Sequence, residues 1–541
     1  MNLKHAARLG LAALLVAWSF DQLFWGKPPG ISFPIFVLIC LAAGAYLTWV
    51  EGLRPAPTSC LVLAPVLFFA GMTFLRREPF SLLLAYGLAL GGLGLLSVTW
   101  LGGGWWAYNL RDYARNALRW VGLVLVRPAT FFLSRYRRMA DNPALQGEGE
   151  RVPWLLRSQA QAFLSVLGGL ALALPVVSLL GSLLASADPV FSEQLGFLVR
   201  LLSLERISEY LFRAWYISLG AYFLSGVFLY ALEASREEKM NGVEGEGSWF
   251  TPILGWIPAV TILVCVDLLF AFFVLVQFRY FFGGEANIDL AGFTYADYAR
   301  RGFAELVVVA FLSLVLLLGL NQITKRETPP VKRTYSGLGI GLVGLVAIML
   351  VSAFQRLLLY EAAYGFTRLR AYTHVFMIWL GVLLVIVALL EGFGRLRRLA
   401  LVLIAVVLGF GASLTLLNVD GFVARQNVAR AAQGEALDVP YLVDLSVDAD
   451  PALFELFDSS AYSADLHDRL GVVLACREAA NRMRPAATAW PSYHWSEARS
   501  AQLFQAHAGQ LAAYPVVQVD YWLAVELDGE PVPCDSYQSW D

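Results

Sequence analysis

Residues 277–305, QFRYFFGGEANIDLAGFTYADYARRGFAE, join two apolar runs that are each long enough to cross a membrane. The runs cover residues 250–278 and 303–321, and roughly 20 apolar residues span a hydrocarbon core. The segment between them concentrates Tyr, Asp and Arg side chains, which are costly at a membrane boundary and tend to lie where a helix bundle does its work. The stretch therefore predicts a membrane-embedded bundle with a polar working surface at one end.

The composition of the whole chain leads to the same fold class. Hydrophobic residues make up 58% of it and charged residues only 15%, which excludes an ordinary soluble domain. Apolar runs of spanning length cover residues 7–24, 32–50, 59–75, 81–101, 158–186, 210–233, 250–278, 303–321, 336–359, 374–391 and 399–417. We therefore expect an all-α polytopic membrane bundle of about eleven transmembrane helices, in a range of about ten to twelve.

The distribution of basic residues predicts which side each loop faces. Lys and Arg gather on the cytoplasmic side of membrane proteins, and more than half of the 40 lie in alternate loops that are cytoplasmic if the N-terminus is inside. Arg76 and Arg77 break this pattern. No small-x-small cleavage pattern follows the first apolar run, so we expect an uncleaved first span. The N-terminus is predicted to be cytoplasmic and the C-terminus to lie on the opposite side.

The chain is expected to have four parts. Residues 1–101 are the first transmembrane group of about four spans, 102–157 a basic amphipathic cytoplasmic linker, 158–417 the second transmembrane group of about seven spans, and 418–541 a C-terminal extracytoplasmic domain. In the linker, Arg111, Arg115 and Arg119 share one helical face beside aromatic side chains. Such a face suits a helix on the inner leaflet, where anionic lipids attract it. Nucleic-acid binding could use the same residue types, but we expect no nucleic-acid partner.

The C-terminal domain has ordinary polar content and room for one small, mainly helical fold. Apolar periodicity predicts helices over residues 420–434, 449–457, 462–483 and 495–512, and the β-branched and aromatic stretch 514–527 predicts a strand or hairpin. Cys476 and Cys534 could form one disulfide if the domain is outside, and two unpaired buried thiols are the alternative. No His or Cys cluster has metal-ligand spacing, so we expect no metal and no cofactor.

The opening segment carries the first candidate site. Asp297 lies three residues after Thr294 and, with Arg301 and Glu305, forms a ladder of alternating charge at a spacing of four. Helix capping and charge pairing explain this ladder structurally. The functional interpretation is that Arg300 and Arg301 hold an anion such as a lipid phosphate. Tyr295 and Tyr298 would then pack against the rest of the ligand.

A second polar patch is predicted on the same side of the membrane. Arg356, Tyr360 and Tyr364 share a face near the outer end of one span. The short connection that follows carries Glu361, Arg368, Arg370, Tyr372 and His374. An arginine inside a span needs a partner, and the intramembrane Asp267 is the candidate, although its depth in the span argues against direct contact with Arg356. A buried structural ion pair is the simpler interpretation of this pair.

Several segments resemble one family in order and spacing. They are DQLFWGKPPGISFPIF near the start, LLASADPVF at 183–191, QFRYFFGG with TYADYARRGF at 277–303, RLLLYEAAYGFTRLR at 356–370 and NVARAAQGEALDVPYLVDLSVDADPAL at 427–453. Together they resemble the bacterial multi-pass membrane proteins of domain of unknown function 4173, which is related to 4153. The resemblance implies a bundle in the bacterial cytoplasmic membrane with an extracytoplasmic tail. It implies no reaction, substrate or catalytic residue.

Three classes of function follow from these residues. A binding or accessory protein of the bacterial envelope would hold an anionic lipid head group or a protein partner at the polar outer face, and we favour this class. An enzyme acting on a lipid-linked or anionic substrate would need an acid or base, for which Asp297, Glu305 and Glu361 are candidates. A transporter would use Asp267 and Arg356, but no internal repeat supports it. The H-E-x-x-H motif and the P-loop are absent from the sequence.

Overall fold

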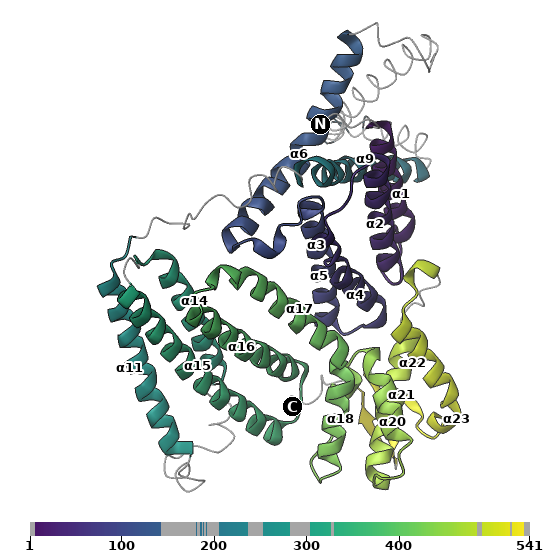
Figure 1. Cartoon of the computed structure of the whole chain (residues 1–541). Coiled ribbons are helices and arrows are strands. Elements are labelled where there is room, and N and C mark those ends of the chain that lie inside the picture. The colour runs from purple at the N-terminus through teal and green to yellow at the C-terminus, as the bar shows by residue number, and fades with distance from the viewer. Residues whose placement is uncertain are drawn as a thin grey trace. The chain divides into compact units, whose positions relative to one another are not determined.

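The structure is a computed structural model of the whole chain (Figure 1). It describes residues 6–141, 205–235, 253–281, 303–325, 329–483, 489–519, 522–527 and 529–534, with a few single positions between 180 and 191. The described residues are almost entirely helical, and three short strands lie near the C-terminus. This agrees with the predicted all-α fold class.

Ten helical segments among the described residues are long and apolar enough to cross a membrane. They are α1 (Ala6–Phe24), α2 (Ser32–Val50), α3 (Pro57–Cys60) with α4 (Leu63–Leu75), α5 (Pro79–Thr99), α9 (Glu205–Leu229) with η3 (Tyr230–Ala234), α11 (Trp256–Phe281), α14 (Phe303–Ile323), α15 (Pro329–Tyr364), α16 (Arg368–Gly392), and η4 (Leu396–Arg398) with α17 (Leu399–Leu417). They confirm the polytopic membrane bundle. The span predicted at residues 158–186 lies outside the described residues.

The chain folds as two compact units, and the smaller one comprises Ala6–Asp21 and Gly122–Leu229. Its described helices are most of α1, the later part of α6 (Leu110–Asp141) and α9. Asp21 is fully buried and accepts hydrogen bonds from the Arg213 guanidinium, 2.9 Å from Nε, and from the Tyr216 hydroxyl. A carboxylate inside an apolar helix is therefore compensated by a cation within the same unit.

The predicted basic linker contains the long helix α6. Its contact with lipid stays a prediction.

The larger unit contains the remaining membrane helices and the C-terminal domain. Helices α2, α4 and α5 pack around one apolar core that includes Val37, Val66 and Phe69. Helices α11, α14, α15 and α16 pack around a second core, and α17 contributes Leu399 and Val406 to it. Since other side chains of α17 pack against the first core, this helix joins the two groups.

Two contacts show that α11 and α15 run in the same direction. Asp267 lies beside Gly341, and ten residues further along α11 the Gln277 Oε1 accepts a hydrogen bond of 2.6 Å from the Ser352 Oγ. Because α14 separates them in the chain, α11, α14 and α15 form an antiparallel series, as successive membrane spans must. α15 has 36 residues, about 54 Å of helix. Its ends therefore extend beyond a hydrocarbon core of about 30 Å.

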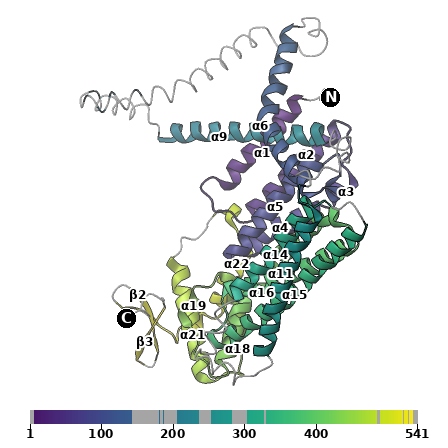
Figure 2. The same cartoon turned by 90° about the vertical axis from the view of Figure 1, so that its left-hand side faces the viewer.

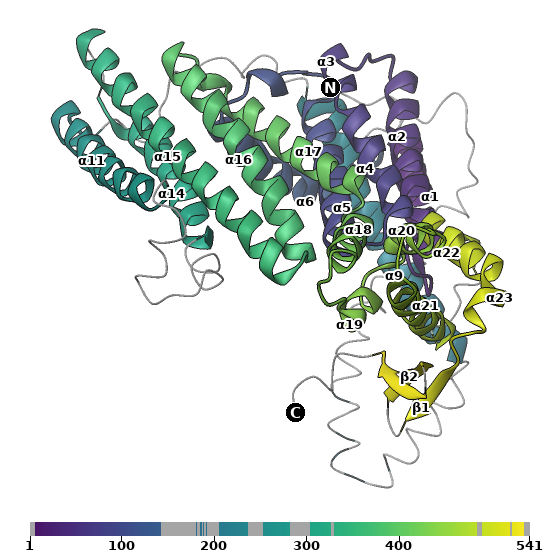
Figure 3. The ribbon, with the colours of Figure 1, turned by 90° about the horizontal axis from the view of Figure 1, so that it is seen from below.

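The C-terminal domain consists of short helices and a small sheet (Figures 2 and 3). Its elements are α18 (Val419–Ala431), α19 (Val439–Val443), η5 (Val447–Ala449), α20 (Asp450–Phe457), α21 (Ala464–Met483), η6 (Trp490–Ser492), α22 (Trp495–Ala506), α23 (Ala508–Leu511), β1 (Val516–Val519), β2 (Trp522–Leu527) and β3 (Glu530–Pro533). The antiparallel sheet has the order β1-β2-β3 and pairs Val516 with Val525 and Ala524 with Pro533. The predicted mainly helical domain with a terminal strand or hairpin is confirmed, and α19 was not predicted.

A single residue connects the last membrane helix to this domain. Asn418 ends α17 in the left-handed region, with φ of 51°, and its side chain accepts a hydrogen bond of 3.2 Å from the Gly421 N–H at the start of α18. Its Nδ2 also donates to the carbonyl of Asp448 at 2.8 Å. Asn is one of the few residues besides Gly that adopts this conformation readily. The direction of α18 is thus set without a linker.

Candidate functional site

Most of the first predicted site lies outside the described residues. Tyr295, Asp297, Tyr298, Arg300 and Arg301 all belong to the segment 282–302. Only its flanks are described. On one side Gln277 is buried against α15, and on the other Glu305 is exposed in the first turn of α14. The anion-binding role of the segment therefore stays a prediction.

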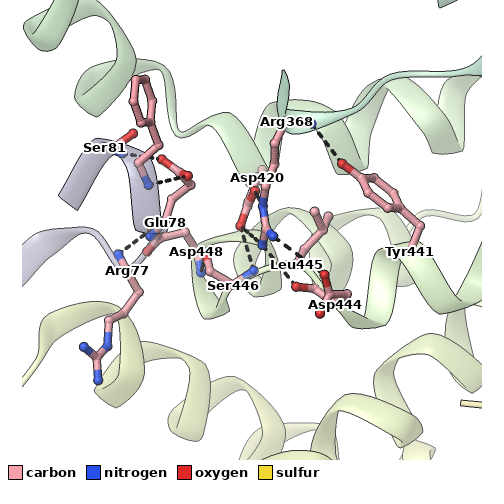
Figure 4. Close-up of polar contacts among 12 residues, drawn as sticks. Arg77, Glu78, Ser81, Arg368, Asp420, Tyr441, Asp444, Leu445, Ser446 and Asp448 are labelled. Carbon is pink, nitrogen blue, oxygen red and sulfur yellow. Dashed lines mark hydrogen bonds and ion pairs between the residues drawn. The ribbon is translucent and has the colours of Figure 1, made fainter. Parts of the chain in front are cut away.

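The structure reveals a different polar cluster where the membrane helices meet the C-terminal domain (Figure 4). We call it the junction and define it as Arg77, Glu78, Arg368, Tyr372, Asp420 and Asp448. Two of its residues come from the α4–α5 connection, two from the start of α16 and two from the domain. All six belong to the larger unit.

One half of the junction is an ion pair between Arg368 and Asp420. The guanidinium donates from Nε and Nη2 to the two carboxylate oxygens at 2.7 and 2.8 Å, and Asp420 is completely buried. The same carboxylate accepts a hydrogen bond of 2.7 Å from the Ser446 N–H. The Arg368 N–H donates to the Tyr441 hydroxyl at 2.9 Å. Bidentate pairing of this kind fixes both distance and orientation.

The other half is built on the α4–α5 connection. Asp448 Oδ2 accepts hydrogen bonds from the N–H groups of Arg77 and Glu78 at 2.6 and 2.9 Å. Glu78 caps α5 by accepting from the N–H groups of Phe80 and Ser81, with Pro79 at the first helical position. The Tyr372 hydroxyl of α16 donates to Glu78. Burial raises the pKa of the Asp448 carboxyl above its ordinary value, and the two N–H donors oppose part of this rise.

The α22 segment adds a second contact to the same connection. His494 is buried, and its Nε2 lies 3.1 Å from the carbonyl of Thr73 in the last turn of α4. The Arg77 Nε donates to Glu497 at 2.7 Å. Burial, assisted by the positive charge of Arg77, lowers the pKa of His494 below its ordinary value. A neutral imidazole that donates from Nε2 and accepts at Nδ1 from Ser496, 3.1 Å away, satisfies this environment.

The second predicted patch is divided between two roles. Arg368 and Tyr372 belong to the junction, whereas Arg370 lies over the Tyr360 ring, 4.1 Å from its centroid, and donates to the carbonyl of Gly365. Tyr364 is half exposed, and its ring is 4.9 Å from that of Tyr360. Arg368 and Arg370 are thus already engaged by groups of the protein.

Glu361 and His374 form a titratable pair whose remaining polar atoms lack hydrogen-bond partners among the described residues. His374 Nδ1 lies 3.2 Å from Glu361 Oε1, and Glu361 is only 1% exposed. Among the described residues, neither carboxylate oxygen nor His374 Nε2 has a hydrogen bond of good geometry. A buried carboxylate beside an imidazole can hold or pass a proton.

The sequence of the chain matches one known protein family. The model of the family described as "Domain of unknown function (DUF4153)" matches residues 63–456. The chain belongs to the DUF4153 family. No curated protein and no solved structure matches it. All six junction residues lie within the matched DUF4153 region, whereas His494 and Glu497 lie beyond it. The relation to domain of unknown function 4173 stays a prediction.

Asp267 and Arg356, the two intramembrane charges predicted to be partners, do not meet in this DUF4153 protein. Asp267 lies at the level of Gly341, whereas Arg356 is on the same helix 15 residues further along, a rise of about 22 Å. This length of helix separates Arg356 from Asp267, its candidate partner, and rules out a direct pair between them. Arg356 is buried, as an arginine inside a span is expected to be.

Sequence reasoning missed the three acidic residues of the DUF4153 junction. Glu78, Asp420 and Asp448 are buried, but the junction residues that they contact lie far away in the chain. One signal was available, because Arg76 and Arg77 break the predicted distribution of basic residues. In the structure the Arg76 Nε donates to the carbonyl of Thr415 at 2.8 Å, and Arg77 pairs with Glu497.

The domain itself is fastened by a further buried pair and a disulfide. Arg477 donates to Asp450 at 2.6 Å and to the carbonyl groups of Leu442, Val443, Leu445 and Ser446. Cys476 in α21 and Cys534 after β3 are joined by a disulfide across 58 positions of sequence. The segment that carries Asp448 is thus held from inside the domain as well as from the membrane helices.

Proposed function

We propose that this protein is an integral membrane binding or accessory protein whose C-terminal domain is a platform fixed to one end of the helix bundle. The observation that carries the proposal is the junction, in which two separate connections between membrane helices hold the domain through Asp420 and Asp448. Domains joined only by a linker are expected to move relative to one another. Here Asn418 replaces the linker, and buried charge pairs oppose displacement.

The charges of the junction support a positioning role better than a chemical one. Arg368 is paired with Asp420, and Glu78 and Asp448 accept hydrogen bonds from backbone N–H groups. Breaking such a buried pair by removing one partner costs about 3–5 kcal/mol. Side chains whose separation costs this much free energy are suited to holding the domain in place.

We further propose which face of the membrane the C-terminal domain occupies and which class of ligand the protein binds. We place the C-terminal domain on the extracytoplasmic face of the bacterial cytoplasmic membrane, which the Lys and Arg distribution and the disulfide favour. The ligand would be an anionic lipid head group or an envelope protein. The binding residues we propose are Tyr295, Asp297, Tyr298, Arg300 and Arg301, together with Arg356 and Tyr360. Arg368 and Arg370 are omitted, because Arg368 is paired with Asp420 and Arg370 lies over the Tyr360 ring and donates to the Gly365 carbonyl.

Co-purification tests this proposal. The wild type, Asp420→Asn, and Arg300→Ala combined with Arg301→Ala would be extracted gently, and their bound lipids and proteins identified by mass spectrometry. Arg425→Gln is the matched control, because its pair with Glu455 at 2.9 Å lies on the exposed surface of the same domain. We expect the wild type and the control to carry the same specific molecules and the other two variants to lose them. The proposal fails if all four proteins carry the same set.

An enzyme is the second candidate, and the Glu361–His374 pair is the observation in its favour. Wild-type protein in nanodiscs would be incubated with an extract of envelope lipids, and new products would be sought by mass spectrometry. Product formation that Glu361→Gln abolishes and the exposed control Glu455→Gln preserves would support an enzyme. Absence of any product with the wild type would leave the platform as the function.

A further inference from the structure

The exposed aromatic side chains of the C-terminal domain are concentrated in one short segment. Among the described residues after Leu417, the exposed large hydrophobic side chains are Trp490, Tyr493, Trp495 and Val516. The three aromatic ones fall within six positions, and Trp490 is 65% exposed. A soluble surface would have little reason to gather large apolar rings in this way.

This aromatic segment touches the ends of two membrane spans. The Ile31 N–H, one residue before α2, donates to the carbonyl of Tyr493 at 2.8 Å. Gly30 packs directly against the same backbone, where a side chain would collide with it. On the other side, His494 is 3.1 Å from the carbonyl of Thr73, close to the end of α4 at Leu75.

These contacts relate the segment to the expected level of the bilayer surface. The candidate spans Ser32–Val50 and Pro57–Leu75 begin and end at this level, where one boundary of the hydrocarbon core is expected. Trp and Tyr are enriched at this boundary because their rings are apolar while their N–H and O–H groups remain hydrated. The rings of the segment are exposed at the one height where lipid head groups can cover them.

We propose that Trp490, Tyr493 and Trp495 form a membrane-interface anchor, through which the C-terminal domain contacts the lipid head groups of the same bilayer that holds the helices. The occupant is lipid rather than another protein, because the segment contacts the ends of two candidate spans whose exposed apolar side chains are expected to face lipid. The anchor complements the junction. The junction holds one part of the domain to the helices, and the anchor holds α22 to the membrane surface.

Spin-label accessibility in nanodiscs tests the anchor on the full chain. Cys40, Cys60 and Cys265 would be replaced by Ser, with the Cys476–Cys534 disulfide retained. Labels would then be placed singly at Trp490→Cys, Trp495→Cys and the control Glu530→Cys. Glu530 is exposed on β3, beyond α21 from the membrane helices (Figure 2). Each variant removes at most one ring, so two rings of the anchor remain.

We expect labels at 490 and 495 to collide often with oxygen and rarely with a water-soluble nickel chelate, whereas the label at 530 should show the reverse. Chelate collisions at 490 and 495 that are as frequent as at 530 would place the segment in water and overturn the anchor. Shielding of both labels from both reagents would also overturn it, because protein rather than lipid would then cover the rings.

Discussion

Arg77 and Asp448 are 371 positions apart in the chain, and the N–H of Arg77 donates to the Asp448 carboxylate at 2.6 Å. The contact joins the connection between two early membrane helices to the turn that precedes α20. Together with the Arg368–Asp420 pair, it makes the C-terminal domain part of the same folded unit as the membrane helices.

Replacing Asp420, the buried acid of the Arg368–Asp420 pair, should weaken the attachment of the C-terminal domain to the membrane helices. Asp420→Asn removes the charge that Arg368 and the Ser446 N–H require, and we expect a loss of about 3 kcal/mol. The measurement is the apparent melting temperature in detergent, combined with limited proteolysis between α17 and α18. Asp444→Asn is the control, because the Asp444 side chain is 83% exposed and should change stability by less than about 0.5 kcal/mol. Equal effects of both substitutions would contradict the role of Asp420.

Position 418, at the turn between α17 and α18, should tolerate Gly better than Ala. Ala at φ of 51° is strained and also loses the cap of α18, so Asn418→Ala should cost about 2 kcal/mol. Asn418→Gly loses the cap and the bond to Asp448 but relieves the strain, and its cost should be smaller. Melting curves of the two variants, recorded side by side, provide the comparison. Ala as stable as Gly would show that the left-handed turn does not constrain the corner.

Acidification should weaken the His494 contact. The pKa of His494 is lowered in the folded state, so below about pH 6.5 the unfolded chain gains a proton that the folded chain resists. Stability from this site is thus complete at neutral pH and is lost as the pH falls. His494→Gln should lose less stability than the wild type between about pH 7.5 and 5.5.

His507 provides an internal control for that experiment. Although burial opposes it, hydrogen bonds to the Leu503 carbonyl and to Asp458 raise the pKa of His507. Its contribution is complete below about pH 6.5 and is lost as the pH rises through the raised folded-state pKa. His507→Gln should therefore be relatively more damaging in acid. The assignment of His494 fails if both substitutions change the pH dependence in the same direction.

Sidedness can be tested with two exposed positions at opposite ends of the bundle. Glu455→Cys lies in the C-terminal domain, with a side chain that is 68% exposed, and Arg397→Cys lies in the exposed connection between α16 and α17. In intact spheroplasts an impermeant maleimide should label position 455 at once and position 397 only after the membrane is opened. The opposite order would place the domain in the cytoplasm.

The spans could be predicted from sequence because each one is local. About 20 consecutive apolar residues specify a helix that satisfies its own backbone, so both ends of α2 and the end of α4 were predicted, whereas α16 begins at Arg368, six residues before the predicted start. The capped start of α5 at Glu78 and Pro79 is likewise local. The junction is not local. Asp420 lies 52 positions from Arg368, and nothing near either residue indicates the other.

Charge alone was also misleading at the predicted site. Arg368 and Arg370 suggested an anion-binding patch, but the first is neutralised by Asp420 and the second lies against Tyr360 and the Gly365 carbonyl. The difference arises because an arginine side chain can serve either a ligand or a distant part of its own chain. Only the folded structure decides between these two.

The separation between Arg77 and Asp448 also sets an order for biogenesis. A ribosome that adds about 5–20 residues per second reaches Asp448 on the order of tens of seconds after Arg77. During that time the early helices must enter the membrane with the α4–α5 connection lacking its final partners. A chain that stops after α17 would contain every described membrane helix, yet would lack the acceptors for Arg77 and Arg368. Synthesis of the part that follows α17 is therefore the step at which a nascent chain of this protein can form these contacts, and a point at which quality control could distinguish finished molecules from unfinished ones.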